Sequence, residues 1–157
     1  MNAIAKVTPY IHWRTISFGD TDAAGIVYTT RFTDYCMDAA EFWFREYLDC
    51  DWYEININQG MGTPVVHMEL DFTASLIGGD KLAVVVRVAK ISRSTVTLEF
   101  EGLRKRADND DLTPVFTATF IHCFYSNELD SAIPIPEKQS TLLKDYTVTQ
   151  DSEKSIT

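Results

Sequence analysis

The segment "FGDTDAAGIVYTTRF", Phe18 to Phe32, holds the residues whose types and spacing could do chemistry. Two carboxylates, Asp20 and Asp22, flank one threonine, and an apolar run then leads to Thr29 and into a long helical pattern. A tight turn, a metal-binding loop and a catalytic carboxylate aimed at a helix start all use acidic residues in such a place. Each of these alternatives makes a different demand on the neighbouring residues.

Metal binding does not fit the pattern. With Asp20 as the first ligand of a calcium loop, Ala24 stands where an oxygen ligand is needed and Arg31 stands where a glutamate is needed. The cysteines are odd in number, widely spaced and without a CxxC pair, so neither a zinc site nor a disulfide framework is predicted; they are Cys36, Cys50 and Cys123.

A turn and a catalytic loop both remain open. Aspartate side chains bond to nearby backbone amides, and Gly25 can supply a positive φ, which accounts well for Asp20. The free amides and the positive dipole end of a following helix would instead polarise an ester or thioester carbonyl whose oxygen becomes an oxyanion. A nearby carboxylate could then attack the carbonyl carbon or activate water.

One long helix is predicted from about Thr30 to Leu48. Its polar residues recur at spacings of four, three and four, which gives a single narrow polar stripe: Asp34, Asp38, Glu41 and Arg45. Apolar residues fill most of the remaining circumference, and a helix of this kind is largely buried.

The segments that could cover this helix are rich in β-branched and aromatic residues. Turn-forming stretches at 78–79, 92–94 and 107–111 separate them, which predicts an antiparallel meander. We therefore expect an α+β domain over residues 1–137, with about five strands curled around one central helix, a hotdog fold. Residues 138–157 read as a polar tail of partial order. The predicted strands are Tyr10–Ser17, Thr63–Ser75, Lys81–Ile91, Thr95–Arg106 and Thr113–Ser126.

Composition narrows the class of protein further. The 157 residues carry a formal net charge of -9, which argues against a broad nucleic-acid-binding face. No stretch approaches the roughly 18 consecutive apolar residues of a membrane span. The opening "MNAIAKVTPYIHW" lacks the pattern of a secretory signal, so a soluble cytoplasmic protein is expected.

The opening motif resembles the signature of the 4-hydroxybenzoyl-CoA thioesterase family of hotdog enzymes. The stretches "GTPVVHMELDFTAS" and "GGDKLAVVVRV" are similar to that family in order and spacing, so the likeness covers roughly Trp13 to Pro136. It implies hydrolysis of an acyl-CoA without a metal or redox cofactor, because coenzyme A is part of the substrate. It also implies dimers that join two sheets edge to edge, share each active site across the interface and assemble into tetramers.

By position, the resemblance assigns roles within the motif. Asp22 matches the catalytic carboxylate, and Thr29 matches the residue whose backbone N–H faces the thioester carbonyl. Asp20 matches an orienting or structural acid, while Gly25 and Tyr28 fall among the substrate-binding positions.

One departure from the family concerns the acyl group. Relatives that act on 4-hydroxybenzoyl groups carry an acid in the helix where this chain has Met37. Recognition of a para-hydroxyl group is therefore not implied, and another aromatic acyl group or an aliphatic one stays open.

The histidines do not form conventional hydrolase machinery. There is no GxSxG motif, and His12, His67 and His122 are scattered over predicted strands. His122 reads as a core residue. His67 and Thr63 belong to a segment that runs close to the acyl pocket in the family.

Cations are needed for the phosphates of coenzyme A. Arg93 and Lys90 lie at a predicted turn where family members place basic residues, and Arg104 closes the next strand and could contribute from another subunit. Solvated hairpin ends are the alternative.

The sequence thus predicts a hotdog thioesterase that hydrolyses an acyl-CoA, with an aromatic acyl group favoured. Asp22 is the expected nucleophile or general base, and the Thr29 amide is the expected oxyanion donor. Two rivals remain. One is a thioesterase for aliphatic or carrier-protein-bound acyl chains, and the other is a module that binds acyl-CoA without turnover.

Overall fold

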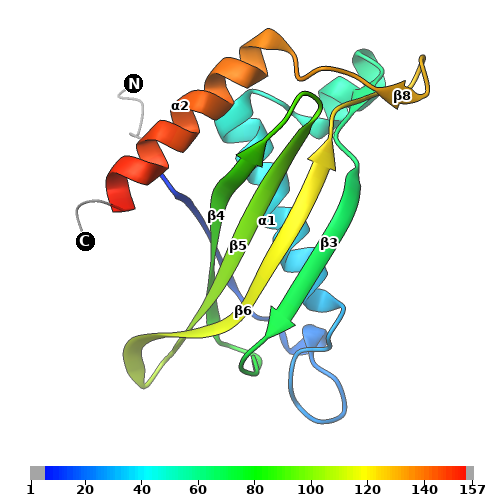
Figure 1. Cartoon of the computed structure of the whole chain (residues 1–157). Helices are drawn as coiled ribbons and strands as arrows, with labels where there is room; N and C mark the ends of the chain where they lie inside the picture. Colours follow the sequence, from blue (N-terminus) through cyan, green and yellow to red (C-terminus); the bar gives the residue numbers. More distant parts are fainter. Residues whose placement is uncertain (1–5, 155–157) are drawn as a thin grey trace, which may run out of the picture.

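The long helix lies across one face of a five-stranded antiparallel sheet. The computed structural model describes residues 6–154. Helix α1 (Arg31–Leu48) is bordered by strands in the order β1–β4–β5–β6–β3 (Figure 1), which confirms the predicted hotdog architecture of the α+β class. The strands are β1 (Tyr10–Thr15), β3 (Val65–Phe72), β4 (Lys81–Ile91), β5 (Thr95–Arg106) and β6 (Asn109–Cys123).

Further elements lie around this sheet. A second, three-stranded sheet pairs its strands in the order β2–β7–β8. The remaining elements are η1 (Phe18–Asp20), η2 (Glu54–Asn58), β2 (Met61–Gly62), β7 (Tyr125–Ser126), β8 (Ser131–Ala132) and α2 (Glu137–Lys154).

The strand order differs from a simple meander. Strands β4, β5 and β6 follow one another, but β3 pairs with β6 at the edge of the sheet and not with β4. In this register Phe72 lies opposite Phe116, and the rings of both residues pack edge-on against Phe32 of α1. The aromatic contact with the helix therefore favours this edge position. The turn expected at 107–111 is also shorter, since β6 begins at Asn109.

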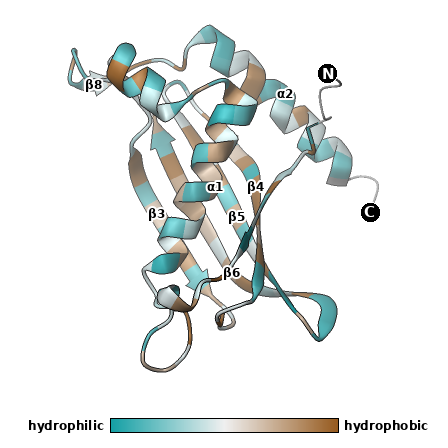
Figure 2. Cartoon of the chain, turned by 180° about the vertical axis from the view of Figure 1, so that it is seen from behind, coloured by the Kyte–Doolittle hydropathy of each residue, from teal (hydrophilic) through white to brown (hydrophobic). Residues whose placement is uncertain are grey.

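The core lies between α1 and the inner face of the sheet. Figure 2 shows the helix in front of the strands, with hydrophobic positions beneath it. Trp43, Phe44 and Leu48 of the helix are fully buried, as its narrow polar stripe predicts. The expected inner face of the last long strand is also confirmed, because all of these residues are buried: Phe116, Ala118, Phe120, His122 and Phe124.

The chain after residue 137 is a helix, whereas the sequence predicts a partly ordered tail. Helix α2 packs beside α1 and β4 (Figure 1), and it buries Leu143 and Tyr146. Residues 155–157 of the predicted tail, like residues 1–5 of the predicted domain, lie outside the described part. This helix was not predicted because its outer side is polar and because polar as well as apolar side chains hold its inner side against the rest of the fold.

Those polar groups complete the hydrogen bonding of β4 next to the start of β1. The Tyr146 hydroxyl donates to the carbonyl of Val86 at 2.6 Å and accepts the amide N–H of Tyr10 at 2.8 Å. The Gln150 side chain accepts the amide N–H of Val88 at 2.9 Å and donates to its carbonyl at 2.7 Å. Gln150 therefore replaces the partner that a longer β1 would supply.

Replacing Gln150 with leucine should leave both backbone groups of Val88 buried and unpaired. We expect Gln150→Leu to lower the free energy of unfolding by about 1–3 kcal/mol, measured by urea denaturation. Thr149→Leu, at the adjacent exposed position, serves as the control. Equal losses in the two variants would contradict this role of Gln150.

Candidate active site

The loop before α1 presents the carboxylate of Asp22 to solvent. An isolated bridge between Thr21 and Val27 closes the loop, and the Asp22 amide N–H donates to the Ile26 carbonyl at 2.9 Å. Asp22 Oδ1 accepts the amide N–H of Ala24 at 2.8 Å, while no described residue bonds to Oδ2. With Gly25 at φ +79°, the predicted turn is present. The turn holds the carboxylate by one oxygen and leaves the other one exposed.

The start of α1 offers unpaired backbone donors. The amides of Arg31 and Phe32 donate to the carbonyls of Tyr28 and Thr29. Within residues 6–154 the amide N–H groups of Thr29 and Thr30 have no acceptor, and the Thr30 side chain does not cap the helix. Free N–H groups at a helix N-terminus bind anionic or partly anionic oxygen.

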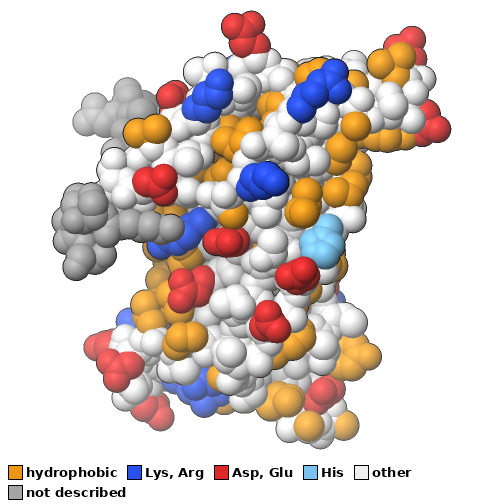
Figure 3. All heavy atoms as spheres, viewed as in Figure 1, with side chains coloured by type: hydrophobic (Ala, Val, Ile, Leu, Met, Phe, Trp, Pro, Cys, Tyr) orange, Lys and Arg blue, Asp and Glu red, His pale blue; other side chains and the backbone are white. Residues whose placement is uncertain are grey.

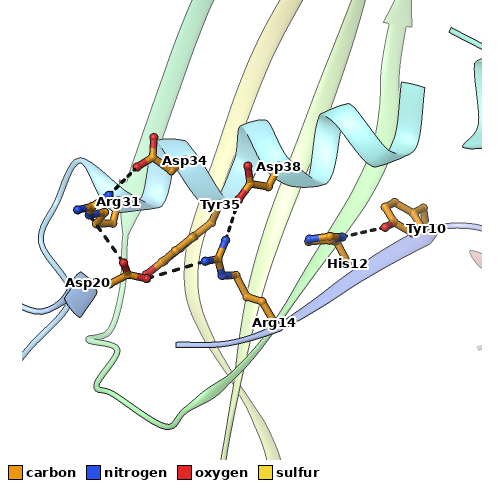
Figure 4. A network of polar contacts seen from close by, with 8 residues as sticks. All are labelled: Tyr10, His12, Arg14, Asp20, Arg31, Asp34, Tyr35 and Asp38. Atoms are coloured by element: carbon orange, nitrogen blue, oxygen red, sulfur yellow. Dashed lines mark hydrogen bonds and ion pairs between the residues drawn. The ribbon is translucent and has the colours of Figure 1, made fainter. Parts of the chain in front are cut away.

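Asp20 anchors this loop to the helix and to β1 (Figure 4). Its Oδ2 accepts the hydroxyl of Tyr35 at 2.8 Å, and the guanidinium groups of Arg14 and Arg31 each lie 3.9 Å from its carboxylate. Its backbone carbonyl accepts the amide N–H of Tyr28 at 3.0 Å. Burial and then the bond to Asp20 raise the pKa of Tyr35, so this hydroxyl stays a donor. Asp20 thus sits where an orienting acid would be expected.

Loss of the Asp20 carboxylate should weaken this anchor. Asp20→Ala leaves the Tyr35 hydroxyl unpaired, and we expect it to reduce the free energy of unfolding by about 1–3 kcal/mol in urea denaturation. Asp34→Ala removes only an exposed ion pair with Arg31 and should cost less than about 0.5 kcal/mol. A similar loss for both variants would show that Asp20 is not the anchor.

A cavity of about 390 Å³ lies between α1, η2 and the beginning of β3. It brings together Met37 and Thr63, two of the predicted substrate-binding residues. His67 does not line it, because this side chain is exposed and its Nε2 lies 2.8 Å from Glu69 Oε1. The other lining residues are Trp52, Asn56, Gly62, Pro64, Val65, Tyr125 and Asn127.

Sequence reasoning missed the wall formed by Trp52, Asn56 and Tyr125. Pairing of β2 with β7 places Tyr125 opposite Gly62, although the two residues lie far apart in the chain. Asn56 fits against Gly62, where a Cβ atom would lie 2.9 Å from its Oδ1. Glycine at position 62 allows this close approach without displacing the Asn56 side chain. No short-range pattern in the sequence indicates these contacts.

The other two histidines are structural. His122 is fully buried, as predicted, and its Nδ1 lies 2.9 Å from the Thr63 carbonyl oxygen. Burial lowers the pKa of His122 to about 4. His12 contacts the Tyr10 hydroxyl through Nδ1 at 2.8 Å and stacks on Phe42, and partial burial lowers its pKa as well.

The predicted coenzyme A cations do not meet within one chain. Lys90 is exposed near the end of β4, and Arg93 is exposed in the following turn. Arg104 lies at the other end of the β4–β5 ladder, opposite Leu82, and donates to the Ser75 carbonyl at 2.6 Å. The antiparallel register separates Arg104 from the other two.

A second cavity, of about 370 Å³, lies on the outer face of the sheet. None of the predicted site residues is part of its lining. Figure 3 shows this face, where acidic and basic side chains are interspersed and not sorted by sign. Arg87 and Glu99, which face each other across β4 and β5, belong to the cavity. It lies on the side of the sheet away from α1 and separate from the loop of Asp22.

No helix within residues 6–154 is long and apolar enough to cross a membrane. No group of three or more His, Cys, Asp or Glu side chains in the same range is placed to hold a metal ion.

Comparison with known proteins identifies the family. Residues 16–143 match the model of the thioesterase-like superfamily, and the chain belongs to this superfamily. A 1,4-dihydroxy-2-naphthoyl-CoA hydrolase of Synechococcus elongatus is 28% identical over 130 residues, which cover 82% of this chain and 90% of that protein. This finding confirms the family predicted from the motif.

Solved structures share the fold. A 1,4-dihydroxy-2-naphthoyl-CoA thioesterase from Synechocystis superimposes with a TM-score of 0.78 at 24% identity, covering 87% of this chain and 96% of that one. The 4-hydroxybenzoyl CoA thioesterase from Pseudomonas sp. strain CBS-3 gives the same TM-score and identity, with coverages of 85% and 97%.

Proposed function

We propose that this protein is a thioesterase that hydrolyses an aromatic acyl-CoA to the free acid and coenzyme A. The observation that carries the proposal is the pairing of an uncapped helix start with an exposed carboxylate on the preceding loop. The amides of Thr29 and Thr30 are free donors, and Asp22 Oδ2 is a free acceptor or nucleophile. Membership of the thioesterase-like superfamily supports this function.

The chemistry follows from these groups. The Thr29 amide N–H donates to the thioester carbonyl oxygen and stabilises the negative charge that develops there, and one such donor is worth about 10²–10³ in rate. Asp22 either attacks the carbonyl carbon or takes a proton from the attacking water. The C–S bond breaks, the CoA thiolate leaves and is protonated, and water supplies the new oxygen of the acid.

The site is proposed to form between two copies of the chain. The Asp22 loop lies near the end of β3, because Val27 donates to the Leu76 carbonyl. The cavity lies at the beginning of the same strand, at Pro64 and Val65. An eight-residue strand spans about 25 Å, so one chain holds its loop and cavity well apart. Antiparallel pairing of β3 with a second β3 would bring the loop of each chain to the cavity of the other.

The edge of β3 supports such pairing. Met68 and Phe72 face the same side as Phe120 and Phe116 of β6, yet 41% and 49% of their surfaces are exposed. Apolar residues on the core side of an unpaired edge strand are typical of a subunit interface. Lys90 and Arg93 are proposed to bind the CoA phosphates.

An aromatic acyl group is favoured by the size and walls of the cavity. Its volume of about 390 Å³ lies at the small end of the ~300–1,000 Å³ range of ligand pockets and leaves room for the acyl group alone. The planar ring of Trp52 and the apolar side chains of Met37 and Val65 form part of its wall. The relative in Synechococcus elongatus is also named for an aromatic acyl-CoA.

Asp22→Asn should abolish hydrolysis while leaving the fold intact. Free-thiol release from benzoyl-, hydroxybenzoyl-, hydroxynaphthoyl-, phenylacetyl- and straight-chain acyl-CoAs should be fastest with one aroyl-CoA, and the variant should lower its kcat/KM by about 10²–10⁴-fold. Asp34→Asn, an exposed acid on the first turn of α1, should keep activity within twofold. Preference for a straight chain would overturn the substrate class. Absence of turnover in the wild type would favour a binding module.

A charge on the β3 edge should separate the subunits. Met68→Lys places a cation on the proposed contact, and we expect the variant to sediment as a monomer and to lose activity. Ile11→Lys, on the opposite edge strand, should change neither property. A monomeric wild type with full activity would exclude the shared site.

A further inference from the structure

The connection between β3 and β4, residues 73–80, supports the loop of Asp22. It leaves an edge strand of the sheet and enters the second strand from the opposite edge. On the way it passes β6, where the Thr73 amide N–H donates to the Val115 carbonyl at 2.9 Å. Within the connection Leu76 is fully buried. The connection is therefore part of the packed end of the sheet.

The loop of Asp22 is bonded to this connection on both sides of the carboxylate. Before it, the Ile16 amide N–H donates to the Asp80 carbonyl at 2.8 Å. After it, the Val27 amide N–H donates to the Leu76 carbonyl at 2.9 Å. These bonds fix the backbone that carries the proposed reactive group and leads to the proposed oxyanion donor.

Two arginines of β5 hold the connection from the side of the sheet. Arg104 donates to the Ser75 carbonyl at 2.6 Å. Arg106 donates to both carboxylate oxygens of Asp80, over 2.9 Å from Nε and 3.4 Å from Nη2. Alternate residues of a strand share one face, so both arginines continue the core face of β5 that includes the buried Phe100. The connection is thus clamped to β5 at two points.

The carboxylate of Asp80 is the inner part of this clamp. Only 2% of its side chain is exposed. Its Oδ2 also accepts the Ile77 amide N–H at 2.9 Å, so the carboxylate bonds the connection and the arginine together. Charged hydrogen bonds with two-pronged geometry are among the strong ones. Because a buried carboxylate without its cation is costly, the position of the connection depends on Arg106.

We propose that Arg104 and Arg106 are positioning residues for hydrolysis, and that they act through the β3–β4 connection on Asp22 and on the Thr29 amide. The inference rests on the proposed thioesterase function and adds residues that lie outside the loop itself. It gives Arg104 a role within its own chain in place of the CoA contact expected from the sequence. A misplacement of about 1 Å in a reacting group can reduce a rate by about 10²-fold, so loss of the clamp should lower kcat.

Kinetics of clamp variants test this role against a matched control. Arg106→Lys keeps the charge but not the two-pronged bond, and Arg104→Gln removes the bond to the connection. We expect each variant to lower kcat for the preferred acyl-CoA by about 10–100-fold and to change KM less than threefold, because the displaced groups act in the transition state. Lys105→Gln changes a neighbouring cation that pairs with the exposed Asp110, and it should keep kcat within twofold.

Hydrogen exchange gives a second measurement that does not depend on turnover. The Val27 amide should exchange about tenfold faster in Arg106→Lys and in Arg104→Gln than in the wild type, while amides in the middle of β4 and β5 keep their rates. A loss of global stability would instead speed exchange throughout the sheet. If Arg106→Lys folds poorly, Arg104→Gln carries the same test, because its bond is exposed.

Two results would overturn the inference. One is an unchanged exchange rate at Val27 in both clamp variants, and the other is a rise in KM with kcat unchanged. Absence of thiol release by the wild type from every acyl-CoA would count against the proposed function. The exchange rate at Val27 would then still decide whether the arginines position the loop.

Discussion

The burial of α1 is the constraint on which the rest of the structure depends. A helix that is apolar around most of its circumference cannot be covered by a flat surface, so the sheet curls around it and α2 covers a further side. The first turn of α1 lies next to the loop of Asp22. The unpaired amides of Thr29 and Thr30 are the donors that the start of a helix leaves without an intrahelical partner. The core and the candidate site share one element.

The two edges of the sheet differ in how their backbone groups are covered, and this difference bears on the proposed pairing of two chains. Next to the start of β1, Tyr146 and Gln150 bond backbone groups of β4 that β1 leaves unpaired, so this part of the edge is closed within the chain. Within residues 6–154 the edge of β3 pairs with no further strand, and Met68 and Phe72 are partly exposed on its core side. An unpaired edge with apolar flanks is a liability for a protein that works as a monomer. A second copy of the chain would need an unpaired edge of this kind to pair with β3.

Much of the fold could be predicted because its signals are local. The polar stripe of α1 repeats within each turn, and the bounds of β4 and β5 match the β-branched runs at Lys81–Ile91 and Thr95–Arg106. Helix α2 was not predicted because its buried face includes Gln150, a polar residue. The Gln150 side chain is buried because it bonds the backbone N–H and carbonyl groups of Val88, which no described strand pairs. The place of β3 beside β6 was missed for a related reason, since the contact of Phe72 with Phe32 joins distant segments.

The candidate site also has one part that could be predicted from the sequence and one part that could not. The motif around Asp22 and Thr29 could be found because a loop and a helix start are neighbours in the chain. The cavity could not be found, because Trp52 and Tyr125 meet only through the pairing of β2 with β7 and the position of η2. The separation of Arg104 from Lys90 follows from strand register, which spacing alone does not reveal.

The two acids of the motif have different roles: Asp20 fixes the loop, and Asp22 is the proposed reactive carboxylate. A reactive carboxylate must reach substrate and, in the proposed dimer, the partner's cavity, so Asp22 has to be exposed. An exposed loop is mobile unless other groups fix it. Asp20 supplies that fixation through the buried Tyr35 hydroxyl and through its carbonyl bond to Tyr28, one residue before Thr29. The close spacing of the acids thus lets one carboxylate anchor the backbone that carries both the other carboxylate and the oxyanion donor.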